Sequence, residues 1–174
     1  MKTLLFQSNN KQFSFKEFEL YWTYKNELWD LTGETRYPES EVKTWYFDWL
    51  RSSGYVIRIY DDSYQNAKGF DQPSQIGFVF IGIKENCHTD CDFYVQDAYL
   101  SPKFRNQHIM QMTMQKFIED FPGKYCLFLI DSNLVAIHFW QSLFQKLGYH
   151  EFPIVDYAQM ETPWCHQHAF QKGD

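Results

Sequence analysis

The residues most able to do chemistry lie in the stretch DAYLSPKFRNQHIM, from Asp97 to Met110. Apolar residues ending at Leu100 predict a strand, and the polar residues after it predict a loop that opens a helix. Backbone N–H groups at such a junction, together with the helix dipole, can bind a phosphate group. Such loops are usually rich in glycine, which reaches positive φ and places no Cβ in the path of a ligand. This loop contains no glycine.

Phosphate binding at this loop depends on how His108 and Met110 are accommodated. We expect His108 to keep an ordinary helical backbone with its ring pointing sideways, since the first turn of a helix has normal α dihedrals. Its ring, Arg105 and Gln107 could then donate to phosphate oxygens. The Met110 side chain either packs under the sheet or narrows the groove. The alternative is an ordinary strand–helix loop whose amides bind water.

Residue types that can bind metals also occur, in Cys87-His-Thr-Asp-Cys91 and Cys165-His-Gln-His168. A zinc site needs four converging ligands, and the Cys-x3-Cys spacing has no second matched pair. We therefore expect unpaired cytosolic thiols and no metal. Cys126 lies in an apolar run and is predicted to be a buried thiol.

Composition indicates one α/β domain over residues 1–174, with 44 % hydrophobic and 20 % aromatic residues. No apolar run approaches the ~18 residues of a membrane span, and the start is too weakly apolar for a signal peptide. A cytoplasmic location with no membrane partner follows as an expectation. The oligomeric state is left open.

The net charge of −6 is concentrated in the middle of the chain. Residues 61–100 carry seven acids against Lys68 and Lys84, a net charge of −5. This acidic segment argues against nucleic acid as a partner and favours a cationic one. The alternative is an acidic, solvated face.

Periodicity and turn residues predict the elements that must position these groups. The βαβ step from Tyr94 to Leu129 implies parallel neighbours with a right-handed crossover, and hence a mixed sheet with helices on both faces. The predicted helices cover about 14–31, 42–52, 110–121 and 136–147, and the predicted strands about 3–6, 55–60, 75–83, 91–100, 125–130, 151–157 and 166–171.

This order of elements resembles the GNAT superfamily of N-acetyltransferases. The resemblance is carried by Tyr99-Leu-Ser-Pro-Lys-Phe-Arg105 before a helix, Asn133-Leu-Val-Ala136 with Phe139-Trp140, and Lys146-Leu-Gly-Tyr149. It covers residues 75 to 157. It implies an acyl-CoA N-acyltransferase fold, with acetyl-CoA as the co-substrate.

Two departures from the family pattern stand out. The usual Arg/Gln-x-x-Gly-x-Gly/Ala is replaced by Arg105-Asn-Gln-His108-Ile-Met110. The helix after Asn133 is about one turn longer than is common, so the usual tyrosine falls on Trp140 or Phe144, neither of which has a hydroxyl.

The resemblance implies a cleft where two parallel strands splay apart, with pantetheine on the first strand's open edge. Asp97 would accept the amine proton directly or through water, although a plain polar residue on an exposed strand face is an equal alternative. Tyr99 would face the acceptor, while Tyr149 is expected in the core. The residues expected to bind the cofactor are Ala98, Leu100, Arg105, Asn106, Gln107, His108, Ile109, Met110, Asn133 and Trp140.

The predicted function is transfer of an acetyl group from acetyl-CoA to a primary amine of a small molecule or peptide, by direct attack in a ternary complex. One alternative is a degenerate GNAT domain that binds CoA or a partner without turnover, which the lost glycines and the missing tyrosine favour. Another is an unrelated α/β binding module.

Overall fold

The computed structural model describes residues 2–7, 15–52, 54–61, 74–84, 90–152 and 165–173. The helices are α1 (Phe15–Thr32), α2 (Glu39–Ser52), α3 (Ile109–Asp120) and α4 (Leu134–Lys146). The strands are β1 (Lys2–Gln7), β2 (Tyr55–Asp61), β3 (Ser74–Ile83), β4 (Phe93–Leu100), β5 (Tyr125–Ile130), β6 (Tyr149–Glu151) and β7 (Cys165–Lys172).

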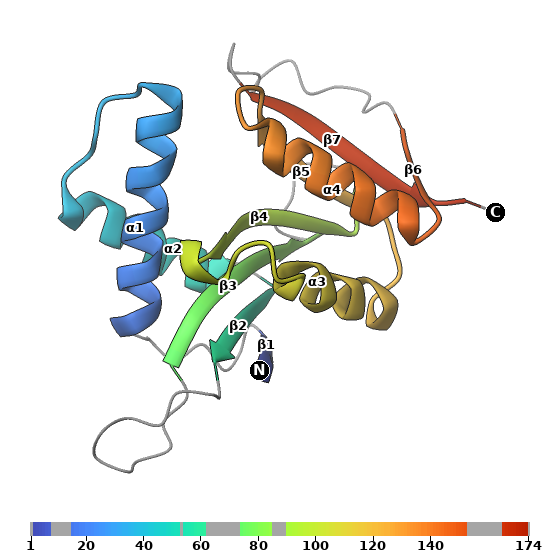
Figure 1. The fold of residues 1–174 in the computed structure, drawn as a ribbon, viewed down its shortest axis with the longest axis horizontal. Coiled ribbons are helices and arrows are strands. Elements are labelled where there is room, and N and C mark those ends of the chain that lie inside the picture. Colours follow the sequence, from blue (N-terminus) through green and yellow to red (C-terminus); the bar gives the residue numbers. More distant parts are fainter. Residues whose placement is uncertain are drawn as a thin grey trace.

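The strands form one seven-stranded sheet in the order β1-β2-β3-β4-β5-β7-β6 (Figure 1). Strands β4 and β5 are parallel, and the other neighbours are antiparallel, so the predicted mixed sheet is confirmed. The penultimate strand begins at Tyr149 rather than near Glu151. Residues 153–164, which cover most of the range predicted for that strand, lie outside the described residues.

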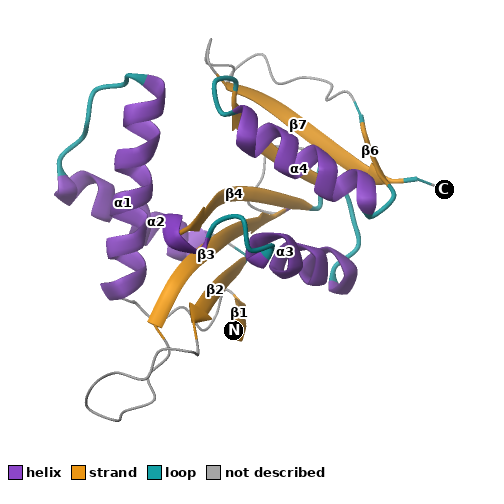
Figure 2. Ribbon diagram, in the orientation of Figure 1, coloured by secondary structure: helices purple, strands orange, loops and turns teal. Residues whose placement is uncertain are grey.

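Helices cover both faces of the sheet, as the sequence predicted (Figure 2). The α1 and α2 side chains pack with Phe78, Phe80 and Tyr99 in one cluster. The α3 and α4 side chains pack on the other face with residues such as Val79, Val95 and Leu127. Tyr149 lies in this second cluster, which confirms its expected place in the core.

A β-bulge in β4 decides which face each of its side chains meets. Ile81 pairs with Val95, but the preceding residue Phe80 pairs with Asp97, so Gln96 is an extra residue in the ladder. An extra residue reverses the alternation of side chains beyond it. Val95 therefore packs on the α3–α4 side. Asp97 instead contacts side chains of α1.

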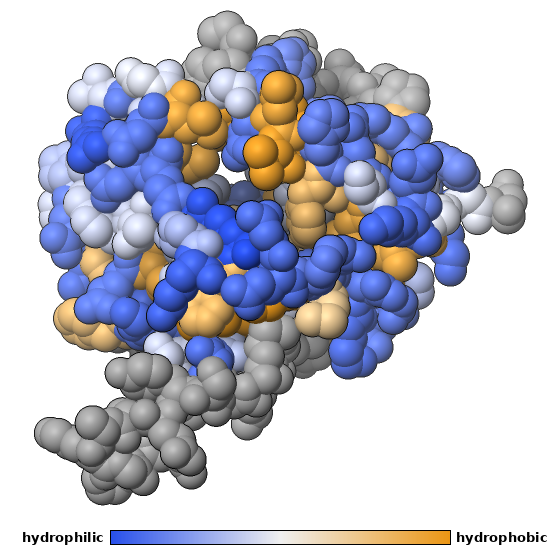
Figure 3. Space-filling model, viewed as in Figure 1, coloured by the Kyte–Doolittle hydropathy of each residue, from blue (hydrophilic) through white to orange (hydrophobic). Residues whose placement is uncertain are grey.

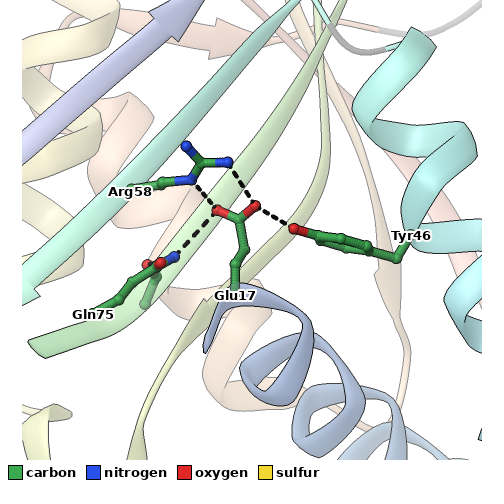
Figure 4. A network of polar contacts seen from close by, with 5 residues as sticks. Glu17, Tyr46, Arg58 and Gln75 are labelled. Carbon is green, nitrogen blue, oxygen red and sulfur yellow. Dashed lines mark hydrogen bonds and ion pairs between the residues drawn. The ribbon is translucent and has the colours of Figure 1, made fainter. Parts of the chain in front are cut away.

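Helix α1 is fixed to the sheet by a buried polar network around Glu17 (Figure 4). The Glu17 carboxylate is fully buried and accepts from Arg58 Nε at 2.7 Å and from Arg58 Nη2 at 3.1 Å. It also accepts from the Tyr46 hydroxyl at 2.7 Å and from Gln75 Nε2 at 3.1 Å. Burial alone lowers the pKa of Arg58, but the hydrogen bonds and charge of Glu17 raise it above its ordinary value. The network joins α1, α2, β2 and β3 at one point.

Candidate active site

The two parallel strands of the sheet separate towards their carboxyl ends. The pairing of β4 with β5 runs from Phe93↔Tyr125 to Val95↔Leu127 and goes no further. Beyond it, β5 continues to pair with β7 on its other side. The edge of β4 from Gln96 to Leu100 is therefore not paired with β5, and it can accept an added extended chain.

A cavity of about 740 Å³ occupies the space beside this open edge. Its walls come from α1, the end of β4, the loop before α3, and the first two turns of α4. Figure 3 shows the corresponding hollow between the α1 side and the α4 side of the molecule. The lining residues are Tyr24, Glu27, Leu28, Leu31, Ala98, Tyr99, Leu100, Arg105, Asn106, His108, Met110, Gln111, Asn133, Val135, Ala136, Phe139 and Trp140.

Most of the residues that the sequence singled out for cofactor binding line this cavity. The eight that do are Ala98, Leu100, Arg105, Asn106, His108, Met110, Asn133 and Trp140. Gln107 is exposed outside it, and its amide donates to the Lys103 carbonyl at 3.1 Å. Ile109 is 7 % exposed and packs in the core, where it anchors the first turn of α3.

The backbone of the loop before α3 differs from the sequence expectation. His108 is not helical but left-handed, with φ 57° and ψ 9°, and Asn106 has φ 62°. Among the described residues these are the non-glycine positions with positive φ. The chain turns sharply between the 3-10 turn at Pro102–Phe104 and α3, and left-handed residues make that turn. His108 therefore occupies the backbone conformation that glycine adopts most easily.

The amino end of α3 offers backbone N–H groups at the loop. His108 is the N-cap residue, and its side chain makes no capping hydrogen bond. Its Nδ1 instead lies 3.0 Å from Gln111 Oε1. The first N–H groups of a helix have no partner within the helix, and backbone turns with left-handed residues form anion-binding concavities. The loop can thus hold a phosphate group without glycine.

Replacing His108 by glycine should relieve the left-handed strain. We expect His108→Gly to stabilise the fold by about 0.5–1 kcal/mol, which is the strain removed less the added entropy of the unfolded chain. Chemical denaturation measures this, and Gln107→Gly is the matched control, expected to destabilise. Acetyl-CoA affinity should hold or tighten. A large loss of affinity would instead show that the imidazole itself is a ligand.

Arg105 is held between the strand end and α1. Its Nε donates to the Leu100 carbonyl at 2.8 Å, and its Nη2 lies 2.6 Å from Glu27 Oε2. The guanidinium also lies over the Tyr99 ring, 5.4 Å from its centre. The Tyr99 hydroxyl donates to the other oxygen of Glu27 at 3.0 Å. Burial, followed by the hydrogen bond and charge of Glu27, raises the pKa of Tyr99 to about 12.

Asp97 does not line the cavity, and it is not on an exposed strand face either. It is 6 % exposed and lies beneath α1. Its Oδ1 accepts from the Tyr24 hydroxyl at 2.6 Å and lies 3.4 Å from Lys25 Nζ. Burial, followed by the charge of Asp97 and the hydrogen bond to it, raises the pKa of Tyr24 well above its ordinary value. Tyr24 does line the cavity, so its phenol connects Asp97 to the cavity wall.

The α4 side of the cavity is built from its N-cap and first turns. Asn133 caps the helix by accepting from the Ala136 N–H at 3.1 Å. Trp140 is 5 % exposed and stacks with Phe144 at a ring separation of 6.2 Å. Phe144 is fully buried. Trp140 and Phe144, the two positions on which the family's usual tyrosine would fall, are therefore packed aromatic rings without a hydroxyl.

The α1 wall of the cavity was not found from the sequence. Tyr24, Glu27, Leu28 and Leu31 are spaced i, i+3, i+4 and i+7, which places them on one face of the helix. A polar stripe of Lys16, Glu19, Thr23, Asn26 and Asp30 runs along one side of this helix, and apolar residues cover most of the rest. So wide an apolar face does not by itself separate a core face from a cavity face. Phe18, Leu20, Tyr21 and Trp29 are the buried apolar residues of the same helix.

The structure describes only part of the residues behind the predictions on cysteines, metal ligands and the acidic segment. Cys91 and Cys126 are buried, as predicted for Cys126. No group of three or more metal-ligating residues exists in the described part of the chain, and Cys87 lies outside it. Asp90 and Asp92 contact Lys124 at the amino end of β4, away from the cavity. Asp62, Asp71 and Glu85 lie outside the described residues, and no described helix is long and apolar enough to cross a membrane.

Comparison with known proteins now places the chain in a family. Residues 18–145 match the model of the acetyltransferase (GNAT) family, and this chain belongs to that family. The match begins inside α1 and ends inside α4. It confirms the resemblance inferred from the sequence motifs. A search of curated proteins found no match.

Solved structures share the fold at low sequence identity. A GNAT-family acetyltransferase from Staphylococcus aureus aligns with TM-score 0.58 at 10 % identity, covering 98 % of both chains. An acyl-CoA N-acyltransferase from Pseudomonas aeruginosa aligns with TM-score 0.55 at 10 % identity, covering 98 % of this chain and 99 % of that one. The NatC complex bound to Gag peptide and CoA aligns with TM-score 0.52 at 11 % identity, covering 100 % of both chains.

Proposed function

We propose that this GNAT protein is an N-acetyltransferase that moves the acetyl group of acetyl-CoA to a primary amine of a small molecule or peptide. The observation that carries the proposal is the cavity at the unpaired end of β4. It combines a free strand edge, a helix N-terminus and a separate wall from α1. A thioester arm and an amine can therefore approach the same point from two sides.

The cofactor's place follows from the backbone donors. The pantetheine arm would extend along Gln96–Leu100 as an added strand, with Asn133 and Trp140 on its far side. The diphosphate would lie at the loop of Asn106 and His108, where N–H groups and the dipole of α3 favour an anion. The residues present fit acetyl-CoA, since eight of the ten predicted contacts already line the cavity.

The amine nitrogen would then attack the thioester carbonyl directly, and the CoA thiolate would leave. An amine arrives mostly protonated at neutral pH, so the site must take up a proton. Asp97 is the proposed acceptor, reached through Tyr24: the phenol takes the amine proton as it gives its own to the carboxylate. The raised pKa of Tyr24 is compatible with this, because the phenol never stays ionised. The nitrogen loses its second proton to solvent as the amide forms, and the thiolate leaves without a tyrosine acid and takes up one proton from solvent.

Titration with acetyl-CoA tests the proposal at its first step. Saturation at 100 times Kd should stabilise the fold by about 2.7 kcal/mol, which a thermal shift detects, and calorimetry gives Kd itself. Thiol release with a panel of amines tests the second step. Binding without thiol release would support the alternative of a domain that binds CoA without turnover, which the Glu27–Arg105 ion pair across the cavity favours. Absence of binding by the folded protein would contradict both.

A further inference from the structure

Glu27 is the acid that lines the cavity. Among the described residues of its wall, no other carries a carboxyl group, since Asp97 is covered by Tyr24. The Glu27 side chain is 39 % exposed, and each of its oxygens accepts one hydrogen bond, from Tyr99 and from Arg105. An ionised carboxylate has about four acceptor sites, so this oriented group can bind a further donor.

The position of Glu27 relates it to the reacting centre. Tyr99 lies on β4 between Ala98 and Leu100, the stretch that would hold the thioester arm, and its side chain reaches Glu27 on the α1 side. Tyr24 lies one turn before Glu27, with its ring 5.8 Å from that of Tyr99. A cation bound to Glu27 would thus lie on the α1 side of the thioester arm, beside the Tyr24–Asp97 pair.

Apolar side chains surround this carboxylate on both rims of the cavity. Leu28 and Leu31 follow Glu27 on α1, and Val135 and Phe139 face them from α4. Leu31 is 42 % exposed and Val135 is 82 % exposed. Figure 3 shows hydrophobic surface on either side of the hollow. Two apolar rims that flank one carboxylate fit a molecule with a single charge and an apolar body.

We propose that Glu27 binds the ammonium group of the acceptor, and that the acceptor is a monocationic primary amine carried by an apolar aliphatic or aromatic group. This inference rests on the proposed acetyl transfer. An acceptor that carries a carboxylate beside its amine would be repelled by the Glu27 carboxylate. Arg105 would not offset this repulsion, because it already donates to Glu27 and to the Leu100 carbonyl. A polyamine would bring further ammonium groups against leucine and valine, where no described acid could pair with them.

The test uses four acceptors on the full chain: phenethylamine, ethylamine, phenylalanine and spermidine. Phenethylamine should have the highest kcat/KM. Glu27→Gln should raise its KM by about 10- to 100-fold, the expected effect of losing a charged hydrogen bond, while the acetyl-CoA Kd holds or tightens. Glu34→Gln, beyond the end of α1, is the matched control and should change nothing. Leu31→Ser should raise KM for phenethylamine but not for ethylamine.

Amine binding measured without turnover separates this inference from the proposed reaction. Calorimetry should show phenethylamine binding that Glu27→Gln weakens by about 10- to 100-fold, with or without acetyl transfer. Such binding with no thiol release would contradict the proposed function and leave the assignment of Glu27 standing. Preference for spermidine or phenylalanine, or unchanged phenethylamine binding in Glu27→Gln, would overturn the assignment.

Discussion

The Asp97→Asn variant is expected to bind acetyl-CoA as the wild-type protein does and to acetylate its amine about 100-fold more slowly. General base catalysis typically contributes 10²–10⁴-fold, and asparagine keeps the shape of aspartate without its ability to take a proton. The Tyr24 hydroxyl can still donate to the asparagine oxygen, so the wall of the cavity should be preserved. Tyr24→Phe removes the link between Asp97 and the cavity and should lower kcat to a similar extent.

A pH–rate profile distinguishes proton transfer from a structural role. The wild-type kcat should depend on pH, and Asp97→Asn should lose most of that dependence together with most of the rate. Asp90→Asn, at the amino end of β4 with its carboxylate 83 % exposed, is the control and should behave as wild type. An unchanged rate and profile in Asp97→Asn would remove Asp97 from the reaction and leave catalysis by positioning, with Glu27 as the remaining carboxylate of the site.

Glu17→Gln is expected to lower the free energy of unfolding by about 3–5 kcal/mol. The substitution leaves the Arg58 guanidinium, 5 % exposed, without its bidentate carboxylate, and removal of one partner of a buried ion pair costs that much. For a chain of this size the unfolding midpoint should drop on the order of 10 °C. Because Glu17 anchors the helix that carries Tyr24 and Glu27, the cavity wall depends on this network as well.

Urea denaturation measures the loss, and the chain offers a close control. Glu19 lies two residues later on the same helix and pairs with Lys16 in solvent at 3.0 Å, so Glu19→Gln should change stability by less than about 0.5 kcal/mol. Arg58→Met alone should also destabilise. The double variant should lose less than the sum of the two single losses, since no buried charge is then left unpaired. A loss below about 1 kcal/mol for Glu17→Gln would show that water or neighbouring groups replace the carboxylate.

Local patterns in the sequence were sufficient for the elements and for one side of the site. Continuous apolar runs predicted β3 and β5, and the spacing of Met110, Met114, Phe117 and Phe121 predicted α3. The strand–loop–helix from Asp97 to Met110 is contiguous in the chain, so the sequence alone placed a helix N-terminus beside a strand end. The GNAT motifs occur in the same contiguous segments, which is why the family could be recognised at once.

The sequence did not determine what depends on contacts between distant segments. Whether Asp97 faces solvent, the cavity or α1 was set by the bulge at Gln96, which no side-chain pattern marks, and by Tyr24, which lies 73 residues away. The left-handed backbone of His108 was set by the turn between two packed elements, which overrides the local preference of a histidine. Glu27 became the acid of the cavity because α1 turns the side that carries Tyr24, Glu27, Leu28 and Leu31 towards the end of β4. A helix with so wide an apolar face leaves its exact orientation to the tertiary packing, and here the buried Glu17 network fixes it.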